Sequence, residues 1–308
     1  MSYLFTRMES VQAGVRRIAK EQIADGIDII ADEATSAGEA IHQVRKTCKK
    51  LRGLIRLVRS SLGGTYKREN RRFRDVARTL SDLRDAETVI ETFDWIVDDS
   101  MGDSMEDSVD DSRKHLSTVR DALVKRRQAV WGSSDSARSL LEDAGHAMAA
   151  SDVDEWKLSD GDFDAIRGGL SKTYRRARSA LGTVRKHAGV RTDENHEWRK
   201  RVKYHWYHLR LLGNLWPVIF EPWAEEAHRL SRLLGAEHDC AVLREVVTGE
   251  LLPAIDKGAA SDLLRMISER RDSLVDESIL VGTRLFAERP KALVRRTEAY
   301  WAAWRDGG

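Results

Sequence analysis

Residues 41–58, IHQVRKTCKKLRGLIRLV, alternate basic and apolar side chains with the spacing of an amphipathic helix. At about 100° per residue, the apolar side chains gather on one side and the cations on the other. Residues 41–68 contain nine Lys or Arg and no Asp or Glu. Like charges four residues apart destabilise a helix, so this pattern favours a binding role toward a chain of phosphates. The polar face consists of His42, Arg45, Lys46, Lys49, Arg52 and Arg56.

An internal repeat relates the two halves of the 308-residue chain. The string His-x-x-Arg-Lys-x-x-Lys at 42–49 recurs at 196–203, and a Leu-x4-Asp element at 80–85 recurs at 234–239. This repeat predicts two related four-helix units that face each other about a pseudo-twofold axis. The pairs in register are His42/His196, Arg45/Arg199, Lys46/Lys200, Lys49/Lys203, Arg56/Arg210, Leu57/Leu211, Arg78/Arg232, Leu80/Leu234 and Asp85/Asp239.

Helical periodicity extends along nearly the whole chain, and no segment alternates as a strand does. The sequence therefore predicts an all-α protein. We interpret it as a single domain, 1–308, with an N-terminal half at 1–132, a C-terminal half at 163–308 and a connector at 133–162 that contains a short helix at 137–149. The other helices are expected at 11–30, 41–62, 66–97, 107–131, 163–187, 195–216, 220–251, 259–287 and from Pro290 onward, with a turn at 97–106.

The net charge of the chain is only +2, but long segments of the sequence contain charged residues of one sign alone. Residues 165–192 hold eight basic and no acidic residues, whereas residues 85–112 hold eleven acidic and no basic ones. Such blocks usually meet a partner of opposite charge, either within the chain or outside it. Two cysteines are too few for a zinc ribbon or a disulfide framework. The absence of an 18-residue apolar run and of a signal-peptide pattern predicts a cytoplasmic protein.

Further basic side chains are expected to extend the polar face of the repeated helix. Arginine holds phosphate oxygens through its planar fork, and lysine acts as a compact charge. The additional candidates are Arg16, Arg17 and Lys20 on the first helix, Arg74 and Arg78 on the third, Lys172, Tyr174, Arg175 and Arg178 on the fifth, and Lys200 and Arg210 in the second copy of the repeat.

The paired strings resemble a known family. HQVRKTCKKLR at 42–52 and HEWRKRVK at 196–203 look like the two signature motifs of the conserved-histidine α-helical domain, CHAD. LSDLRD at 80–85 and LGAEHD at 234–239 resemble the second element of each half, and the resemblance covers essentially the whole chain. It implies two four-helix bundles around a basic central groove or pore.

The same resemblance implies that the protein binds inorganic polyphosphate without catalysis, and that it is associated with polyphosphate granules. The positions that carry over are His42, Arg45, Lys49, Lys50, Arg52, His196, Arg199 and Lys203. Two positions depart from the pattern, since Tyr204 and Trp206 stand where the first copy has Lys50 and Arg52. The second half would therefore bind more weakly or use Tyr174 and Arg178 instead.

The repeat also predicts the geometry of the site. Arg45, Lys49, Arg199 and Lys203 should line one shared groove, with His42 and His196 at its wall. The acidic block from Asp85 to Asp111 should lie away from this groove, because carboxylates there would cancel its charge.

Three other functions compete with this interpretation. An enzyme is disfavoured because the sequence has no Gly-rich phosphate loop, no G-x-S-x-G and no H-E-x-x-H string. A metal site is disfavoured because Arg and Lys occupy the positions after His42 and His196 where ligands would stand, so no metal or other cofactor is expected. Nucleic-acid binding through the same basic faces stays open as the alternative. Most of the tryptophans, which a single-strand binder would use for stacking, have the spacing of core residues.

Overall fold

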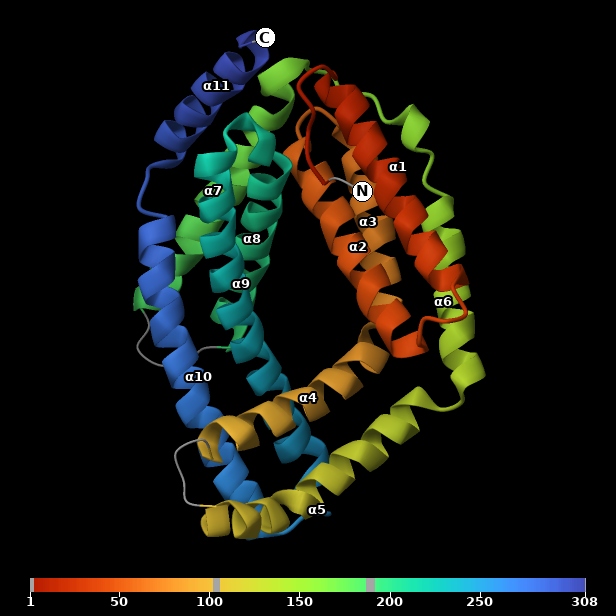
Figure 1. The fold of residues 1–308 in the computed structure, drawn as a ribbon, viewed down its shortest axis with the longest axis vertical. Helices are drawn as coiled ribbons and strands as arrows, with labels where there is room; N and C mark the ends of the chain where they lie inside the picture. The colour runs from red at the N-terminus through yellow and green to blue at the C-terminus, as the bar shows by residue number, and fades with distance from the viewer. Residues whose placement is uncertain (1–2, 102–105, 187–191, 308) are drawn as a thin grey trace.

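The computed structural model describes residues 3–101, 106–186 and 192–307. Within these residues the chain forms eleven α-helices and no strand, which confirms the all-α class (Figure 1). The helices are α1 Val11–Ala31, α2 Ala37–Leu57, α3 Gly63–Thr79, α4 Ser81–Met101, α5 Glu106–Trp131, α6 Ser134–Ala149, α7 Asp162–Lys186, α8 Thr192–Leu211, α9 Pro217–Val246, α10 Lys257–Leu285 and α11 Pro290–Asp306.

Two groups of helices stand side by side and are bridged at both ends (Figure 1). The first group consists of α1, α2, α3 and α6, and the second of α7 to α11. At one end α2 packs against α7 and α8. At the other end α4 and α5 leave the first group and pack against the far ends of α9 and α10. The helices thus surround a central region, although the pseudo-twofold relation between equal bundles stays a prediction.

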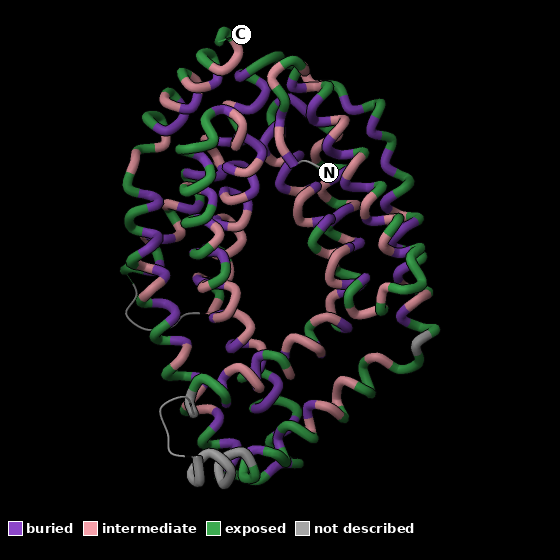
Figure 2. The backbone as a smooth tube through the Cα atoms, viewed as in Figure 1, coloured by how far each residue is buried: buried purple, intermediate pink, exposed green. Residues whose placement is uncertain are grey.

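Two hydrophobic cores hold this arrangement together. The larger core joins both groups, because side chains of α2, such as Leu54, and of α8, such as Trp198, belong to one buried cluster. A smaller core lies where α4 and α5 meet the ends of α9 and α10, around Val119 and Leu243. Figure 2 shows buried residues recurring at helical intervals along these elements. Each helix therefore buries one stripe and exposes the other.

Helix α2 ends at Leu57, five residues before the predicted end. Gly169 of α7 packs against this end, where a Cβ atom would overlap the carbonyl oxygens of Leu57 and Arg56. The backbone of α7 thus lies directly against the last turn of α2. Gly63 begins α3 with a φ of 51°, a left-handed conformation that favours glycine.

The single helix predicted at 66–97 is wrong, since α3 and α4 are separate helices that meet at Leu80. A tertiary contact holds the bend. Arg45 of α2 donates to the carbonyl of Ala77 at 2.9 Å and to the hydroxyl of Ser81 at 2.6 Å. The hydrophobic periodicity of a segment cannot predict a contact made by a residue of another helix. The turn predicted at 97–106 is also displaced, because α4 continues to Met101, and residues 102–105 lie outside the described part of the chain.

The remaining boundaries follow the proline positions and local packing. Helix α8 ends at Leu211 rather than at residue 216, and Pro217 begins α9. The connector predicted at 133–162 contains α6, close to the expected 137–149. Its Leu141 and Met148 side chains and the following Trp156 are fully buried in the larger core. The connector is therefore an integral part of the first group of helices.

Candidate functional site

A cavity of about 520 Å³ lies between α2, α4, α8 and α9. Both copies of the repeated helix contribute to its wall. The lining cations are Arg45, Lys46 and Lys49 from α2, Arg84 from α4, Arg199, Lys203 and Arg210 from α8, and Arg232 from α9. The structure thus brings together the four residues that were expected to share one groove, namely Arg45, Lys49, Arg199 and Lys203.

The apolar faces of α2 and α8 fix the direction of these cations. Val44 and Cys48 on α2 are fully buried, and so are Trp198 and Val202 on α8. Because side chains three to four residues apart share one face of a helix, burial of one side turns the other toward the cavity. Because both copies of the repeat have this amphipathic pattern, the basic faces of α2 and α8 both line the cavity.

The surroundings of the two cavity lysines, Lys49 and Lys203, disfavour positive charge. Burial, followed by the like charges of Lys203, Arg45 and Arg199, lowers the pKa of Lys49 well below its usual value. Burial and the charge of Arg199 lower the pKa of Lys203 to about 8. Burial also lowers the pKa of Arg45. These shifts share one cause, the confinement of several cations in a partly dehydrated space.

Most of these cations lack a carboxylate partner. Among the described residues, no carboxylate lies within ion-pair distance of Lys46, Lys49, Arg199, Lys203 or Arg210. Two cations about 8 Å apart repel each other by roughly 2 kcal/mol at an effective dielectric constant of 20. The empty cavity therefore carries a repulsion that a bound polyanion would remove.

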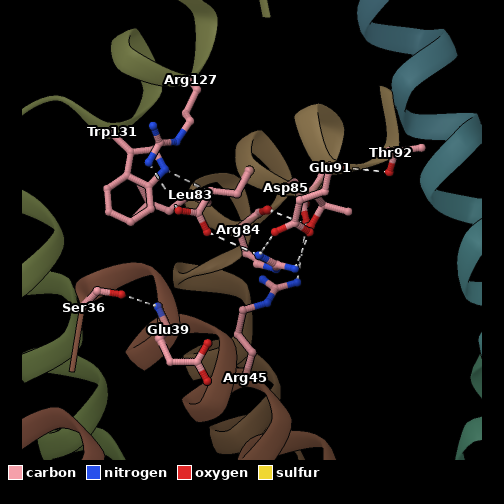
Figure 3. A network of polar contacts seen from close by, with 12 residues as sticks. Ser36, Glu39, Arg45, Leu83, Arg84, Asp85, Glu91, Thr92, Arg127 and Trp131 are labelled. Atoms are coloured by element: carbon pink, nitrogen blue, oxygen red, sulfur yellow. Dashed lines mark hydrogen bonds and ion pairs between the residues drawn. The ribbon is translucent and has the colours of Figure 1, made fainter. Parts of the chain in front are cut away.

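Asp85 and Glu91 of α4 line the cavity, so the prediction that the whole acidic block would lie away from it is wrong. Asp85 lies 3.7 Å from Nη2 of Arg45, and Glu91 accepts from both Nη atoms of Arg84 at 2.8 and 3.0 Å (Figure 3). Both carboxylates line the cavity. The expectation failed because a helix alternates its faces within a single charge block.

Acidic residues further along α4 point elsewhere. Asp94 forms an ion pair with Arg120 of α5 at 2.7 Å, and Asp99 pairs with Arg270 of α10 at 3.3 Å. These carboxylates hold α4 to its neighbours in the smaller core. Neither carboxylate forms an ion pair with a cation of the repeated helices.

Asp239, the repeat partner of Asp85, is a further carboxylate at the cavity. Burial raises its pKa, although the nearby charges of Arg199 and Lys49 act in the opposite direction. Among the described residues, Asp239 makes no ion pair. The cavity therefore contains fewer carboxylates than cations, and one of them is poorly stabilised as an anion.

The two signature histidines differ in position. His42 lines the cavity, whereas His196 does not and instead packs against His238, with ring centroids 4.7 Å apart. Burial and nearby cations lower the pKa of both His42 and His196. Each ring is therefore neutral near pH 7 until an anion arrives. The equivalence expected from the repeat holds for the pairs Arg45/Arg199 and Lys49/Lys203, whereas only one histidine of the pair lines the cavity.

The cations of α1 lie outside the cavity and make structural contacts. Arg16 donates to the carbonyl of Trp156 at 2.9 Å. Arg17 forms an ion pair with Glu9 at 2.7 Å, and Lys20 pairs with Asp154 at 2.7 Å. We therefore correct their assignment, because each secures the ends of the first helix group. Helical spacing reveals a polar face but not the partner that covers it.

The assignment of two residues on α7 is also wrong. Tyr174 is fully buried, and its hydroxyl donates to the carbonyl of Glu288 at 3.0 Å. Arg178 donates to the same carbonyl at 3.0 Å. Both residues hold the turn before α11. They therefore do not replace the two cations that the second copy of the repeat lacks at Tyr204 and Trp206.

The other candidates do not line the cavity. Lys200 forms an ion pair with Glu197 on its own helix, and Arg74 pairs with Asp75 at 2.8 Å. Arg78 is exposed on α3. Lys50 lies near the ring of Tyr3. Arg52 and Arg56 of α2 both donate to the amide oxygen of Asn70 in α3, and Lys172 and Arg175 lie close together on α7.

Several lining residues were not predicted. Arg84 and Glu91 come from α4, and Trp206 and His228 stack with ring centroids 4.3 Å apart at an angle of 6°. Arg232 was paired with Arg78 in the repeat, so its position carried a signal. The positions of Arg84 and Glu91 could not be predicted, because the path of α4 depends on the bend at Leu80.

No group of three His, Cys, Asp or Glu side chains that could hold a metal ion occurs in the described part of the chain. His205 and His208 are fully buried within α8, and burial lowers the pKa of each to about 3. None of the described helices is both long enough and apolar enough to cross a membrane.

Comparison with known families gives one match. A family model described as CHAD domain matches residues 23–248. The matched span contains the last nine residues of α1, all of α2 to α9 and both copies of the repeated helix. A search of curated proteins found no match to this sequence.

Proposed function

The chain belongs to the CHAD domain family, and we propose that it binds inorganic polyphosphate in the cavity between α2, α4, α8 and α9 without catalysing a reaction on it. The observation that supports this proposal most strongly is the set of cations at the cavity that have no carboxylate partner among the described residues. Polyphosphate presents closely spaced charges along a narrow chain. Such a ligand would relieve the repulsion among Lys49, Lys203 and Arg199.

The aromatic side chains at the cavity favour polyphosphate over a nucleic acid. Trp206 is stacked on His228, and its ring also lies 4.8 Å from that of Tyr207. The ring of Trp95 is covered by the guanidinium of Arg270 at 4.6 Å. A single-strand binder needs open aromatic faces on which bases stack. Here those faces have partners already, whereas phosphate groups require only the cations.

The test removes the two central lysines together. Lys49→Gln with Lys203→Gln should weaken polyphosphate binding roughly a hundredfold, since a charge-assisted contact contributes about 1.5 kcal/mol or more. The same variant should unfold at a higher temperature when empty, because the repulsion and the cost of burying the charges are gone. Fluorescence anisotropy and thermal melting measure the two effects.

A matched control removes two exposed cations from α11, Lys291→Gln with Arg295→Gln. This control should change binding less than twofold. Unchanged binding in the cavity variant would rule out this cavity as the polyphosphate site. Reduced stability of the cavity variant would instead assign the lysines a structural role.

A further inference from the structure

An uninterrupted run of exposed apolar residues lies at the N-terminal end of α9. Residues 216–219, with the sequence Trp-Pro-Val-Ile, are all exposed, and Val218 is 77% exposed. A run of three or four apolar side chains in contact with water is unfavourable unless a partner covers it. None of these residues lines the cavity between α2, α4, α8 and α9. The proposed function of the cavity therefore leaves this run unexplained.

Helix α11 extends the apolar surface, because it lies beside the start of α9 (Figure 1). The ring of Tyr300 meets that of Trp216 edge-on, with centroids 5.2 Å apart. Ala299 and Ala303, on the same side of α11 as Tyr300, are exposed. We call this surface the α9–α11 patch and define it as residues 216–219 together with Ala299, Tyr300 and Ala303.

An acidic border lies along the side of α9 that faces away from α11. Trp223 marks the opposite side, because the guanidinium of Arg296 in α11 lies 4.7 Å from its ring centre. Glu221 and Glu225 each lie two residues from Trp223 and therefore about 160° around the helix from it. Both are exposed, and they line a separate cavity beside Tyr3.

A basic border lies along the far side of α11. Lys291 and Arg295 are exposed and lie about 180° and 140° around the helix from Tyr300, which faces α9. In the part of the chain that the structure describes, neither of these cations forms an ion pair, and neither do Glu221 and Glu225. The apolar patch thus has unpaired negative charge along one edge and unpaired positive charge along the other.

A second copy of the chain fits both borders at once. The contacts of Tyr300 with Trp216 and of Arg296 with Trp223 show that α9 and α11 run antiparallel along the patch. In a dimer whose twofold axis follows the direction of these helices, α9 of one protomer faces α11 of its partner. Each acidic border then meets a basic border. An anionic membrane surface would instead repel the carboxylate of Glu221.

We propose that the α9–α11 patch is the interface of a twofold-symmetric homodimer. Its apolar residues form the centre and the charged borders form the rim, as in many protein interfaces. The charges determine the orientation, since pairing α9 with α9 would oppose the carboxylates of Glu221 and Glu225 to those of the second copy. No residue of the patch lines the cavity, so this inference does not depend on the ligand proposed for the cavity.

Sedimentation velocity over a concentration series tests the apolar centre. The unaltered protein should change from monomer to dimer as its concentration rises. Val218→Asp should raise the dissociation constant roughly thirtyfold or more, as expected for a residue near the centre of an interface. Because Val218 is 77% exposed, the variant should keep its fold, which circular dichroism checks. Leu280→Asp is the matched control, since Leu280 is 65% exposed on α10 outside the patch, and its dissociation constant should stay within twofold.

Reversal of the borders tests the orientation. One variant carries Glu221→Lys with Glu225→Lys, and a second carries Lys291→Glu with Arg295→Glu. Each variant alone should be monomeric, because both rim contacts of its dimer would pair like charges. An equimolar mixture should form a heterodimer, because both rim contacts then pair opposite charges. Adding Val218→Asp to both variants should abolish the heterodimer.

Three results would overturn the homodimer. The first is an unaltered protein that stays monomeric up to about 100 μM, since specific interfaces of standard size bind in the micromolar range or more tightly. Binding of that monomer to vesicles of anionic lipid, lost in Val218→Asp, would assign the patch to a membrane surface instead. The second is a dimer that persists unchanged in Val218→Asp. The third is a mixture of the two charge variants that stays monomeric.

Discussion

Lys49 and Lys203 line the cavity in surroundings that disfavour their positive charge. Burial and neighbouring cations lower the pKa of both side chains. The amphipathic pattern of the sequence predicted which residues face the cavity, because burying one side of a helix determines the other. It could not predict partners, which is why Tyr174 and Arg178 were misassigned. Their contacts with Glu288 depend on the packing of distant segments.

The pKa of Lys203 predicts a pH dependence. In the unfolded chain a lysine loses its proton near pH 10.4, whereas Lys203 in the folded protein loses it at about pH 8. Between these values the unfolded state binds more protons, so the stability of the empty protein should rise with pH. The gain attributable to Lys203 should be at most about 3 kcal/mol.

Urea unfolding at neutral and at alkaline pH measures this gain. Lys203→Gln should lack it. Polyphosphate affinity should change in the opposite direction and fall above about pH 8, with proton uptake on binding in calorimetry. A variant with the same pH profile as the unaltered protein would refute the role given to Lys203.

Glu91 is predicted to compete with the ligand. Its carboxylate holds Arg84 at 2.8 Å at the cavity wall and repels an incoming polyanion. Glu91→Gln should therefore strengthen polyphosphate binding about fivefold, corresponding to roughly 1 kcal/mol. Stability should change by less than about 1 kcal/mol, because exposed ion pairs contribute little.

Asp94→Asn is the matched control, since it removes the same charge from the same helix. The Asp94 carboxylate pairs with Arg120 and does not line the cavity. The affinity of this variant should stay within twofold of the unaltered protein. Equal gains from both variants would indicate a general effect of net charge rather than competition at Arg84.

At the scale of elements, the sequence predicted the helices but not their turning points. Periodicity located the ends of every helix to within five residues except at 66–97. There the bend at Leu80 depends on Arg45 donating to Ala77 and Ser81 from another helix. Arg45 therefore has two roles, since it holds the start of α4 and lines the cavity. The path of α4, and with it the position of Arg84, follows from this contact.

The contact between α2 and α7 should be sensitive to a single methyl group. Gly169→Ala would force a Cβ atom against the carbonyl of Leu57 and should destabilise the protein by about 1 to 3 kcal/mol. Gly182→Ala on the same helix has open space and should be neutral or stabilise by up to about 1 kcal/mol. Chemical denaturation of the two variants measures the difference, and equal stabilities would contradict the close approach of α7 to α2.

At the scale of the whole molecule, bridges at both ends bring two basic faces together around one cavity. The internal repeat predicted this convergence, because related helices carry related faces. It did not predict that α4 and α5 would cross between the two groups of helices, since that path depends on the smaller core around Val119 and Leu243. The repulsion within the cavity is therefore balanced by packing at sites remote from it.

A polyanion should stabilise the assembled fold. Ligand that binds only the folded state raises stability by about 2.7 kcal/mol at a hundredfold excess over Kd. Long-chain polyphosphate should therefore raise the melting temperature, with a smaller increase at high salt, where the charges are screened. Calorimetric scans with and without ligand test this expectation. An unchanged melting temperature at high ligand concentration would contradict preferential binding of polyphosphate to the folded protein.

The central claim is that unpaired cations around one cavity bind polyphosphate and not nucleic acids. Its most direct test is a titration of the purified protein with long-chain polyphosphate, single-stranded DNA and orthophosphate at two salt concentrations. We expect polyphosphate to bind at least tenfold more tightly than DNA at moderate salt, with affinity falling as salt increases, and orthophosphate to bind weakly. Equal affinities for polyphosphate and DNA would contradict the claim.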